Sequence, residues 1–293
     1  MALADTFFFP AGLVPADFVQ VPVPPQFMSL ELPLIAGFVL LGLATGFLAG
    51  LLGIGGGMLM VPVVTFILGV KGFPADDRVK MAVATSLATI CFTSITSVWA
   101  HHKRGAVLWP VVGRLLPGIL LGSVLGAQVA VMLPGKALSV LFAVFVAVAA
   151  TQMLLERKPP PNRSLPATPG MLAVGGVIGM VSALVGAGGA FISVPFMQWC
   201  NVRMHNAVAT SAALGFPVAV AGTLSYVLAG LQLPDMPPGS IGYVYLPALV
   251  VISAASMSTA PLGARTAHGM DIRQLRRCFA VVLYCLAAYF LFR

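Results

Sequence analysis

Two copies of a glycine cluster are the residues of this sequence best suited to binding chemistry. Gly46 to Pro62 reads GFLAGLLGIGGGMLMVP, and Gly179 to Pro195 reads GMVSALVGAGGAFISVP. A short apolar run follows each cluster, which predicts helices that begin near Met58 and near Phe191. The free N–H groups and the dipole at the start of a helix favour a bound anion. We therefore expect an anion site where the two clusters face each other.

The candidate binding positions are the tips of the two clusters and the first residues of the helices that follow. They are Gly55, Gly56, Gly57 and Met58 in the first copy and Gly188, Gly189, Ala190 and Phe191 in the second. Glycine allows a positive φ and lets a ligand or another backbone approach closely. Alternatively, these glycines only permit helix packing, which is the role we expect for the series Gly118, Gly122 and Gly126. A packing motif needs neither a shortened segment nor a following proline, so the sequence favours a binding site.

Hydroxyl side chains near the clusters offer neutral donors to an anion. Both halves contain the sequence AVATS early in their third apolar segment, which supplies Thr85, Ser86, Thr210 and Ser211. These hydroxyls can bind an oxyanion without burying a charge, or they can bond back to their own helix. Arg114 is the one charge well inside a predicted span, where it could pair with the anion or extend toward the interface.

Acidic side chains are absent from the interior of the apolar segments. All eight carboxylates fall in the N-terminal stretch, in loops or at segment ends. Cation pumps and many proton-coupled carriers place acids at the centre of the membrane, so this chain is better suited to anions. Clustered His, Cys and acidic residues are also missing, so we expect no metal, no cofactor and no enzymatic activity.

The composition places the chain in a membrane. Of its 293 residues, 59% are hydrophobic and 8% are charged, whereas a soluble domain has about 45 to 50% and about 25%. Apolar stretches long enough to span a bilayer recur from Leu32 onward, so the lipid bilayer is the expected environment and the chain is polytopic. The net charge of +8 comes from basic residues scattered in loops, which membrane topology explains without a nucleic-acid partner.

Ten apolar segments are predicted, five in each half. They lie at residues 30–52, 58–70, 79–101, 107–132 and 136–155, and then at 170–186, 190–200, 206–230, 242–267 and 272–292. A polar, proline-rich stretch separates the halves. We divide the chain into an N-terminal extension (1–29), a first transmembrane repeat (30–155), a linker (156–169) and a second transmembrane repeat (170–293).

The second segment of each half is too short to cross a bilayer, which takes about 20 residues. Whether this segment and its predecessor form a re-entrant hairpin or a distorted full crossing, the pair returns the chain to the side it entered from. Three full spans then follow. Each half then crosses an odd number of times, so two tandem halves have inverted topology. The fold class is therefore an all-α polytopic membrane protein with two inverted repeats, each containing a glycine-broken half-helix. Loop charges favour a cytoplasmic linker and periplasmic termini.

The duplicated motif G-x-G-G-[GA]-x-x-x-V-P, at Gly53 to Pro62 and Gly186 to Pro195, resembles the TauE/SafE sulfite exporter family of membrane permeases. AVATS follows the motif in both halves, and the similarity runs from about Gly42 to Tyr289. The resemblance implies export of a small sulfur-containing anion, such as sulfite, a sulfonate like sulfoacetate, or thiosulfate, across the cell inner membrane. Ala190 replaces the third glycine of the first copy, so the two halves of the site are not identical.

Other functions stay open at this point. An anion channel would use the same helix ends without alternating access, and the substrate could be another small organic anion. A membrane enzyme or a regulatory subunit is a further alternative, against which the missing catalytic clusters count. The sequence leaves the oligomeric state open, with a homodimer as one alternative.

Overall fold

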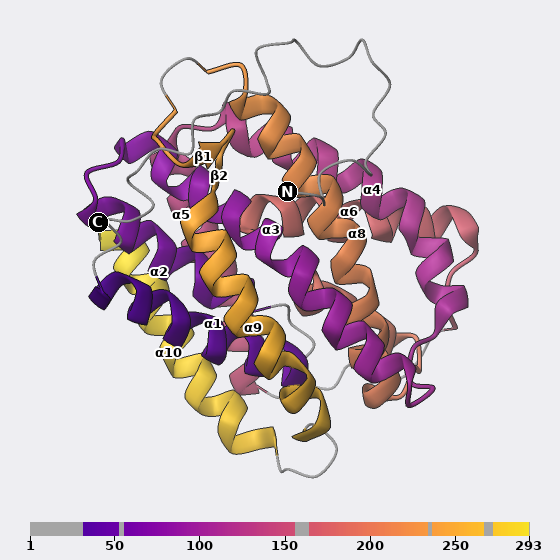
Figure 1. Cartoon of the computed structure of the whole chain (residues 1–293). Coiled ribbons are helices and arrows are strands. Elements are labelled where there is room, and N and C mark those ends of the chain that lie inside the picture. Colours follow the sequence, from indigo (N-terminus) through magenta and orange to yellow (C-terminus); the bar gives the residue numbers. More distant parts are fainter. Residues whose placement is uncertain (1–31, 53–55, 156–163, 234–235, 267–271, 293) are drawn as a thin grey trace, which may run out of the picture.

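The computed structural model describes residues 32–52, 56–155, 164–233, 236–266 and 272–292. Within these ranges the chain forms ten helices and one short hairpin (Figure 1). The first half contains α1 (Leu32–Leu52), α2 (Gly57–Val70), α3 (Ala75–His102), α4 (Trp109–Met132) and α5 (Gly135–Leu155). The second half contains α6 (Thr168–Val185), α7 (Ala190–Trp199), α8 (Met204–Gly230), α9 (Leu246–Thr266) and α10 (Ile272–Phe292). The expected all-helical fold is confirmed.

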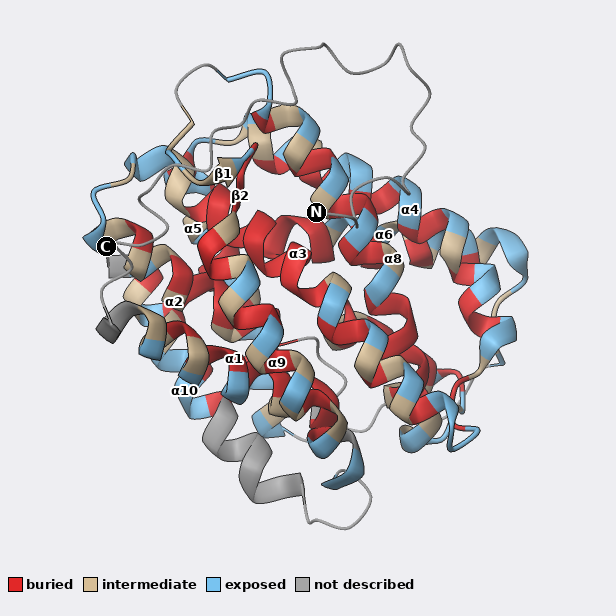
Figure 2. Cartoon of the chain, viewed as in Figure 1, coloured by how far each residue is buried: buried red, intermediate tan, exposed pale blue. Residues whose placement is uncertain are grey.

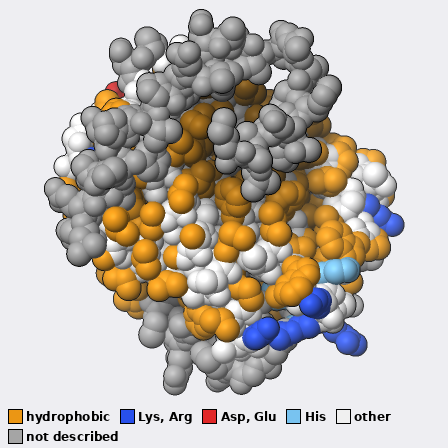
Figure 3. All heavy atoms as spheres, viewed as in Figure 1, with side chains coloured by type: hydrophobic (Ala, Val, Ile, Leu, Met, Phe, Trp, Pro, Cys, Tyr) orange, Lys and Arg blue, Asp and Glu red, His pale blue; other side chains and the backbone are white. Residues whose placement is uncertain are grey.

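Six of the described helices are long and apolar enough to cross a membrane: α3, α4, α5, α6, α8 and residues 246–263 of α9. Large apolar side chains on their outer faces are exposed, for example Leu121 and Met132 on α4. Figure 3 shows hydrophobic side chains spread over one face of the molecule, with most of the visible Lys and Arg at the lower right. An apolar surface of this extent suits lipid, so the chain is a multi-pass membrane protein.

The second helix of each half is short, as the sequence predicts. α2 has 14 residues and α7 has 10, whereas a straight helix needs about 20 to cross the hydrocarbon core. Both contain the proline of the repeated Val-Pro pair, Pro62 in α2 and Pro195 in α7. Their first residues are buried, so each short helix begins inside the protein.

α4 packs against α6 through glycines that bring the two backbones into contact. A Cβ atom on Gly122 would overlap the carbonyl oxygen of Gly176, and one on Gly126 would overlap that of Met180. Gly118 lies against α6 in the same way. The predicted packing role of this series is confirmed. A later residue of α4 contacts a later residue of α6, so the two helices run in the same direction.

α1 and α9 repeat this arrangement. A Cβ atom on Gly42 would lie 2.8 Å from the carbonyl oxygen of Ile252, and one on Gly46 would overlap that of Ser256. These two helices therefore also run in the same direction. The other large helix contacts pair α3 with α8, α5 with α10, α4 with α8 and α3 with α9. The helices α1 to α5 of the first half correspond in order to α6 to α10 of the second half. If each helix is replaced by its counterpart, the same set of contacting pairs is obtained.

A hairpin precedes α9, where the sequence analysis places the start of a long apolar segment at residue 242. β1 (Ser240–Ile241) pairs antiparallel with β2 (Val244–Tyr245). Gly242 has a φ of 54°, and a Cβ atom there would overlap the carbonyl oxygen of Val227 in α8. Glycine thus allows the turn to press against α8, and α9 begins only at Leu246.

α3 lies at the centre of the molecule. Every residue from 79 to 90 is buried, and Figure 2 shows this part of α3 within the protein interior. α8 crosses α3 in the opposite direction, because Leu87 lies against Gly222, whereas Ser97, farther along α3, lines a common pocket with Ala212, an earlier residue of α8. The crossing of α3 and α8 positions the candidate site.

Candidate functional site

The two short helices begin in the same conformation. The residue before α2, Gly56, has a φ of 67°, and the residue before α7, Gly189, has a φ of 78°. This left-handed conformation favours glycine. The first N–H groups of a helix have no carbonyl partner within it. Gly57 and Ala190 therefore carry backbone donors at two buried helix N-termini.

The glycine clusters also join the two halves. Ser86 of α3 donates a hydrogen bond of 2.8 Å to the carbonyl oxygen of Gly186, the residue that ends α6 with a φ of 71°. Gly57 lies against the same carbonyl, which a Cβ atom there would overlap. Gly57, Ser86 and Gly186 thus form a contact between the two halves of the chain.

The two threonines of the AVATS sequences occupy equivalent structural positions. Thr85 accepts a hydrogen bond of 3.0 Å from the N–H of Tyr245, the residue before α9. Thr210 accepts one of 3.0 Å from the N–H of Leu108, the residue before α4. Both threonines are fully buried. Each hydroxyl therefore holds the chain where it leads into a helix of the other half.

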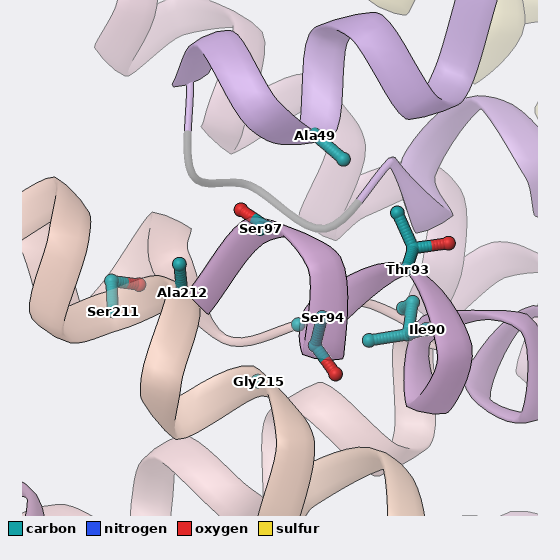
Figure 4. Close-up of a pocket in the computed structure, with 9 residues that line it drawn as sticks. Ala49, Ile90, Thr93, Ser94, Ser97, Ser211, Ala212 and Gly215 are labelled. Atoms are coloured by element: carbon teal, nitrogen blue, oxygen red, sulfur yellow. The ribbon is translucent and has the colours of Figure 1, made fainter. Parts of the chain in front are cut away.

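A small pocket lies where α3 crosses α8 (Figure 4). Its lining residues are Ala49, Ile90, Thr93, Ser94, Ser97, Gly188, Ser211, Ala212 and Gly215. Its volume is about 10 Å³, room for about one water. Hydroxyl groups and a residue of the second glycine cluster meet here, and none of the lining side chains is charged.

Three of the pocket hydroxyls have partners in the protein. Thr93 Oγ1 lies 2.8 Å from the hydroxyl of Ser256, and Ser94 donates to the carbonyl oxygen of Cys91 at 3.1 Å. Ser211 Oγ lies 2.7 Å from the hydroxyl of Ser193.

Ser97 differs from the other pocket hydroxyls. It is only 3% exposed, and its hydroxyl has no hydrogen-bond partner among the described residues. An unpaired buried hydroxyl costs about 1 to 3 kcal/mol. A ligand oxygen that accepted from Ser97 would remove this cost.

Gly188 and Ser211 are the sequence-predicted residues that line the pocket. Gly55 lies outside the described residues. The predicted residues that the structure places elsewhere in the interior are Gly56, Gly57, Met58, Thr85, Ser86, Gly189, Ala190, Phe191 and Thr210. Of these, Phe191 is half-buried and packs its ring against that of Phe145, with 6.4 Å between centroids.

Arg114 does not reach the pocket. It is exposed on α4, where its neighbours Val112 and Leu115 are buried. With 3.6 residues per turn, that spacing turns Arg114 outward, away from the protein interior. The two carboxylates in the described part of the chain, Asp76 and Asp77, lie in the first turn of α3 and also outside the pocket.

The pocket hydroxyls of α3, which are Thr93, Ser94 and Ser97, were not predicted from the sequence. Ser86, Thr89, Thr93 and Ser97 follow one another at intervals of three or four residues, the spacing that places side chains on one face of a helix. This spacing could have identified the hydroxyl-bearing face before the structure was known. Within the described residues, no group of three or more His, Cys, Asp or Glu side chains is arranged to hold a metal ion.

Known proteins resemble the chain over most of its length. The family model for Sulfite exporter TauE/SafE matches residues 38–290. A probable membrane transporter protein of Haemophilus influenzae is 35% identical over 85% of this chain and 95% of its own. Another, from Methanocaldococcus jannaschii, is 27% identical over 89% of this chain and 96% of its own. No solved structure shows significant similarity to the chain. The chain therefore belongs to the sulfite exporter TauE/SafE family, whose relatives above are named as membrane transporters rather than enzymes.

Proposed function

We propose that this transporter carries small sulfur-containing oxyanions, such as sulfite, sulfonates like sulfoacetate, or thiosulfate, and binds them in the pocket between α3 and α8. The observation behind the proposal is the convergence of four hydroxyl side chains with Gly188, next to the start of α7, in a pocket without charged lining residues. Neutral hydroxyl and backbone donors can bind an oxyanion without the cost of burying a cation.

The chemistry of the ligand suits these donors. A sulfur oxyanion presents several oxygens on one atom, each of which accepts hydrogen bonds. The hydroxyl of Ser97 has no partner within the described ranges and is free to donate, and the N–H groups at the start of α7 lie at the positive end of a helix dipole. A hydrogen bond to a charged partner contributes about 1.5 to 3 kcal/mol. Two or three such bonds would give binding that is specific and still reversible.

The pocket must widen to admit an oxyanion, since it now has room for about one water. Movement of one half against the other would widen it, because α3 and α8 come from different halves. The parallel packing of α4 on α6 and of α1 on α9, with α3 and α8 antiparallel, supports an inverted repeat. Inverted repeats commonly work by alternating access around a central site. We propose this mechanism, in the cell inner membrane and with export as the direction.

Binding of sulfite, sulfoacetate and thiosulfate to the purified protein tests the proposal, with acetate as a carboxylate comparator. Ser97→Ala should weaken binding of the preferred sulfur anion by about tenfold or more, because a bond to a charged ligand is lost. Ser258→Ala is the matched control, since this exposed hydroxyl bonds only to its own helix. Equal affinity in the parent and in Ser97→Ala would place the site elsewhere.

An anion channel is the competing function, and flux measurements separate it from a carrier. Protein reconstituted in liposomes that contain unlabelled substrate should take up labelled substrate faster than protein in empty liposomes. A carrier shows this stimulation because its loaded form returns with substrate from the other side. Flux that neither saturates nor responds to substrate on the opposite side would indicate a channel.

A further inference from the structure

α3 and α8, which cross at the pocket, are counterparts in the two halves of the chain and have equivalent residues. Thr85 and Thr210 make the same hydrogen bond to the residue before α9 and before α4, respectively. Counting along each helix from its threonine, Leu87 of α3 corresponds to Ala212 of α8. Ser97 of α3 likewise corresponds to Gly222 of α8. The crossing therefore contains two equivalent places, one at Ser97 and Ala212 and one at Gly222 and Leu87.

The two places differ in what fills them. Ser97 and Ala212 line the pocket. At the other place, Cδ1 of Leu87 lies 2.8 Å from the position of a Cβ atom on Gly222, and the Cβ atom of Ala183 lies 3.7 Å from that position. Leu87 is fully buried. A leucine side chain thus occupies the volume that corresponds to the pocket in the other half.

Leu87 lies near the middle of α3, and Ser97 lies closer to its C-terminal end. α3 begins beside Asp76 and leads to Lys103, so Leu87 lies on the Asp76 side of Ser97. Asp76 and Lys103 are both exposed. We call the two membrane faces the Asp76 side and the Lys103 side. The pocket is displaced toward the Lys103 side, and along α3 the leucine-filled place lies between Ser97 and the Asp76 side.

We propose that Leu87, packed against Gly222, is the gate that closes the path from the pocket to the Asp76 side. The inference rests on the proposed function, in which the pocket binds the transported anion. In this conformation the anion enters and leaves the pocket from the Lys103 side alone. The leucine must withdraw from Gly222 before substrate can leave toward the Asp76 side. The counterparts of Leu87 and Gly222 are Ala212 and Ser97, which leave a pocket open instead of filling it. The same closure therefore cannot form on the Lys103 side.

Cysteine labelling tests the gate without any substrate. A cysteine replaces Ala183, which lies beside Gly222, in a protein without its native cysteines, and a small membrane-impermeant thiol reagent is added from the Asp76 side. Asp76→Cys and Arg104→Cys identify the two sides. Cysteine 183 should be protected while Leu87 is present. In Leu87→Ala its labelling rate should rise by about tenfold or more, because a buried side chain otherwise reacts only through local opening.

A second substitution separates a gate from a general loss of packing. Gly222→Leu added to Leu87→Ala returns the missing volume from the opposite helix and should restore protection of cysteine 183. If Leu87→Ala is not recovered folded, Leu87→Val gives the same test with a smaller opening. Protection that persists in folded Leu87→Ala, or labelling unchanged when the volume is returned, would overturn the gate.

Substrate protection distinguishes this proposal from the proposed function. A cysteine in place of Ala212 should react from the Lys103 side, and a bound sulfur anion should slow that reaction. If Leu87→Ala exposes cysteine 183 as expected but sulfite, sulfoacetate and thiosulfate all leave cysteine 212 reactive, the gate is supported and the proposed substrates are wrong.

Discussion

Ser86 donates a hydrogen bond of 2.8 Å to the carbonyl oxygen of Gly186, so a helix of the first half holds the glycine turn of the second half. The corresponding residue of the second AVATS sequence, Ser211, bonds to Ser193 and lines the pocket. The same repeated serine therefore has a structural role in one half and a place at the candidate site in the other. This difference shows how a duplicated sequence can support a single, asymmetric pocket.

Gly122→Ala should destabilise the protein, because its Cβ atom would overlap the carbonyl oxygen of Gly176 and force α4 away from α6. Overpacking of this kind typically costs about 1 to 3 kcal/mol. The thermal denaturation midpoint of the purified protein in detergent measures the effect. Gly113→Ala on the same helix is the control, since no atom lies within 4 Å of its added Cβ. Equal midpoints for the two variants would refute the packing role.

Thr85→Val and Thr210→Val should both lower stability, because each leaves one backbone N–H without its acceptor, that of Tyr245 buried and that of Leu108 part-buried. The cost of an unpaired buried donor is about 1 to 3 kcal/mol. The affinity of the folded fraction for the anion should stay near that of the parent. Thr266→Val, at an exposed hydroxyl bonded to its own helix, is the control. A large loss of affinity without a loss of stability would assign these threonines to the binding site.

Arg114→Gln should leave anion affinity unchanged, because Arg114 is exposed and absent from the pocket lining. Isothermal titration of the preferred sulfur anion provides the measurement. The expected shift is below about 0.5 kcal/mol, as for most surface substitutions. A tenfold loss of affinity would show that Arg114 approaches the ligand in another conformation of the transporter.

Single cysteines at Asp76 and Arg104 should react from opposite faces of the membrane, since these exposed residues flank the two ends of α3. The excess of basic residues in the loops on the Arg104 side predicts that this side is cytoplasmic. Labelling of intact and of permeabilised cells with an impermeant thiol reagent measures the orientation. Reaction of cysteine 104 in intact cells would reverse the proposed topology and the direction in which the pocket faces.

Helix positions were largely predictable because uninterrupted apolar length determines a membrane-spanning helix. The predicted segment 58–70 and the observed α2 (Gly57–Val70) differ by one residue. The hairpin before α9 was not predictable in this way, because it depends on contact between Gly242 and α8. Local apolar composition contains no information about that contact.

The candidate site was predictable only in part. The repeated clusters and AVATS sequences led to Gly188 and Ser211, which line the pocket. The prediction for Arg114 was based on its position along the apolar segment and not on the face of the helix that carries its side chain. Thr93, Ser94 and Ser97 face the pocket because α3 and α8 cross there. The hydroxyl-bearing face of α3 extends along the helix, and the packing of α3 against α8 determines which of its residues line the pocket.

The most direct test of the account fills the pocket with the residues that fill its counterpart. Ser97→Gly combined with Ala212→Leu reproduces at the pocket the pair found at Gly222 and Leu87, an arrangement this protein already packs. The added side-chain volume should lower the denaturation midpoint only moderately, since overpacking typically costs about 1 to 3 kcal/mol. The folded variant should lose both binding and exchange of the sulfur anion in liposomes. A folded variant that still binds and exchanges the anion like the parent would contradict a binding site between α3 and α8.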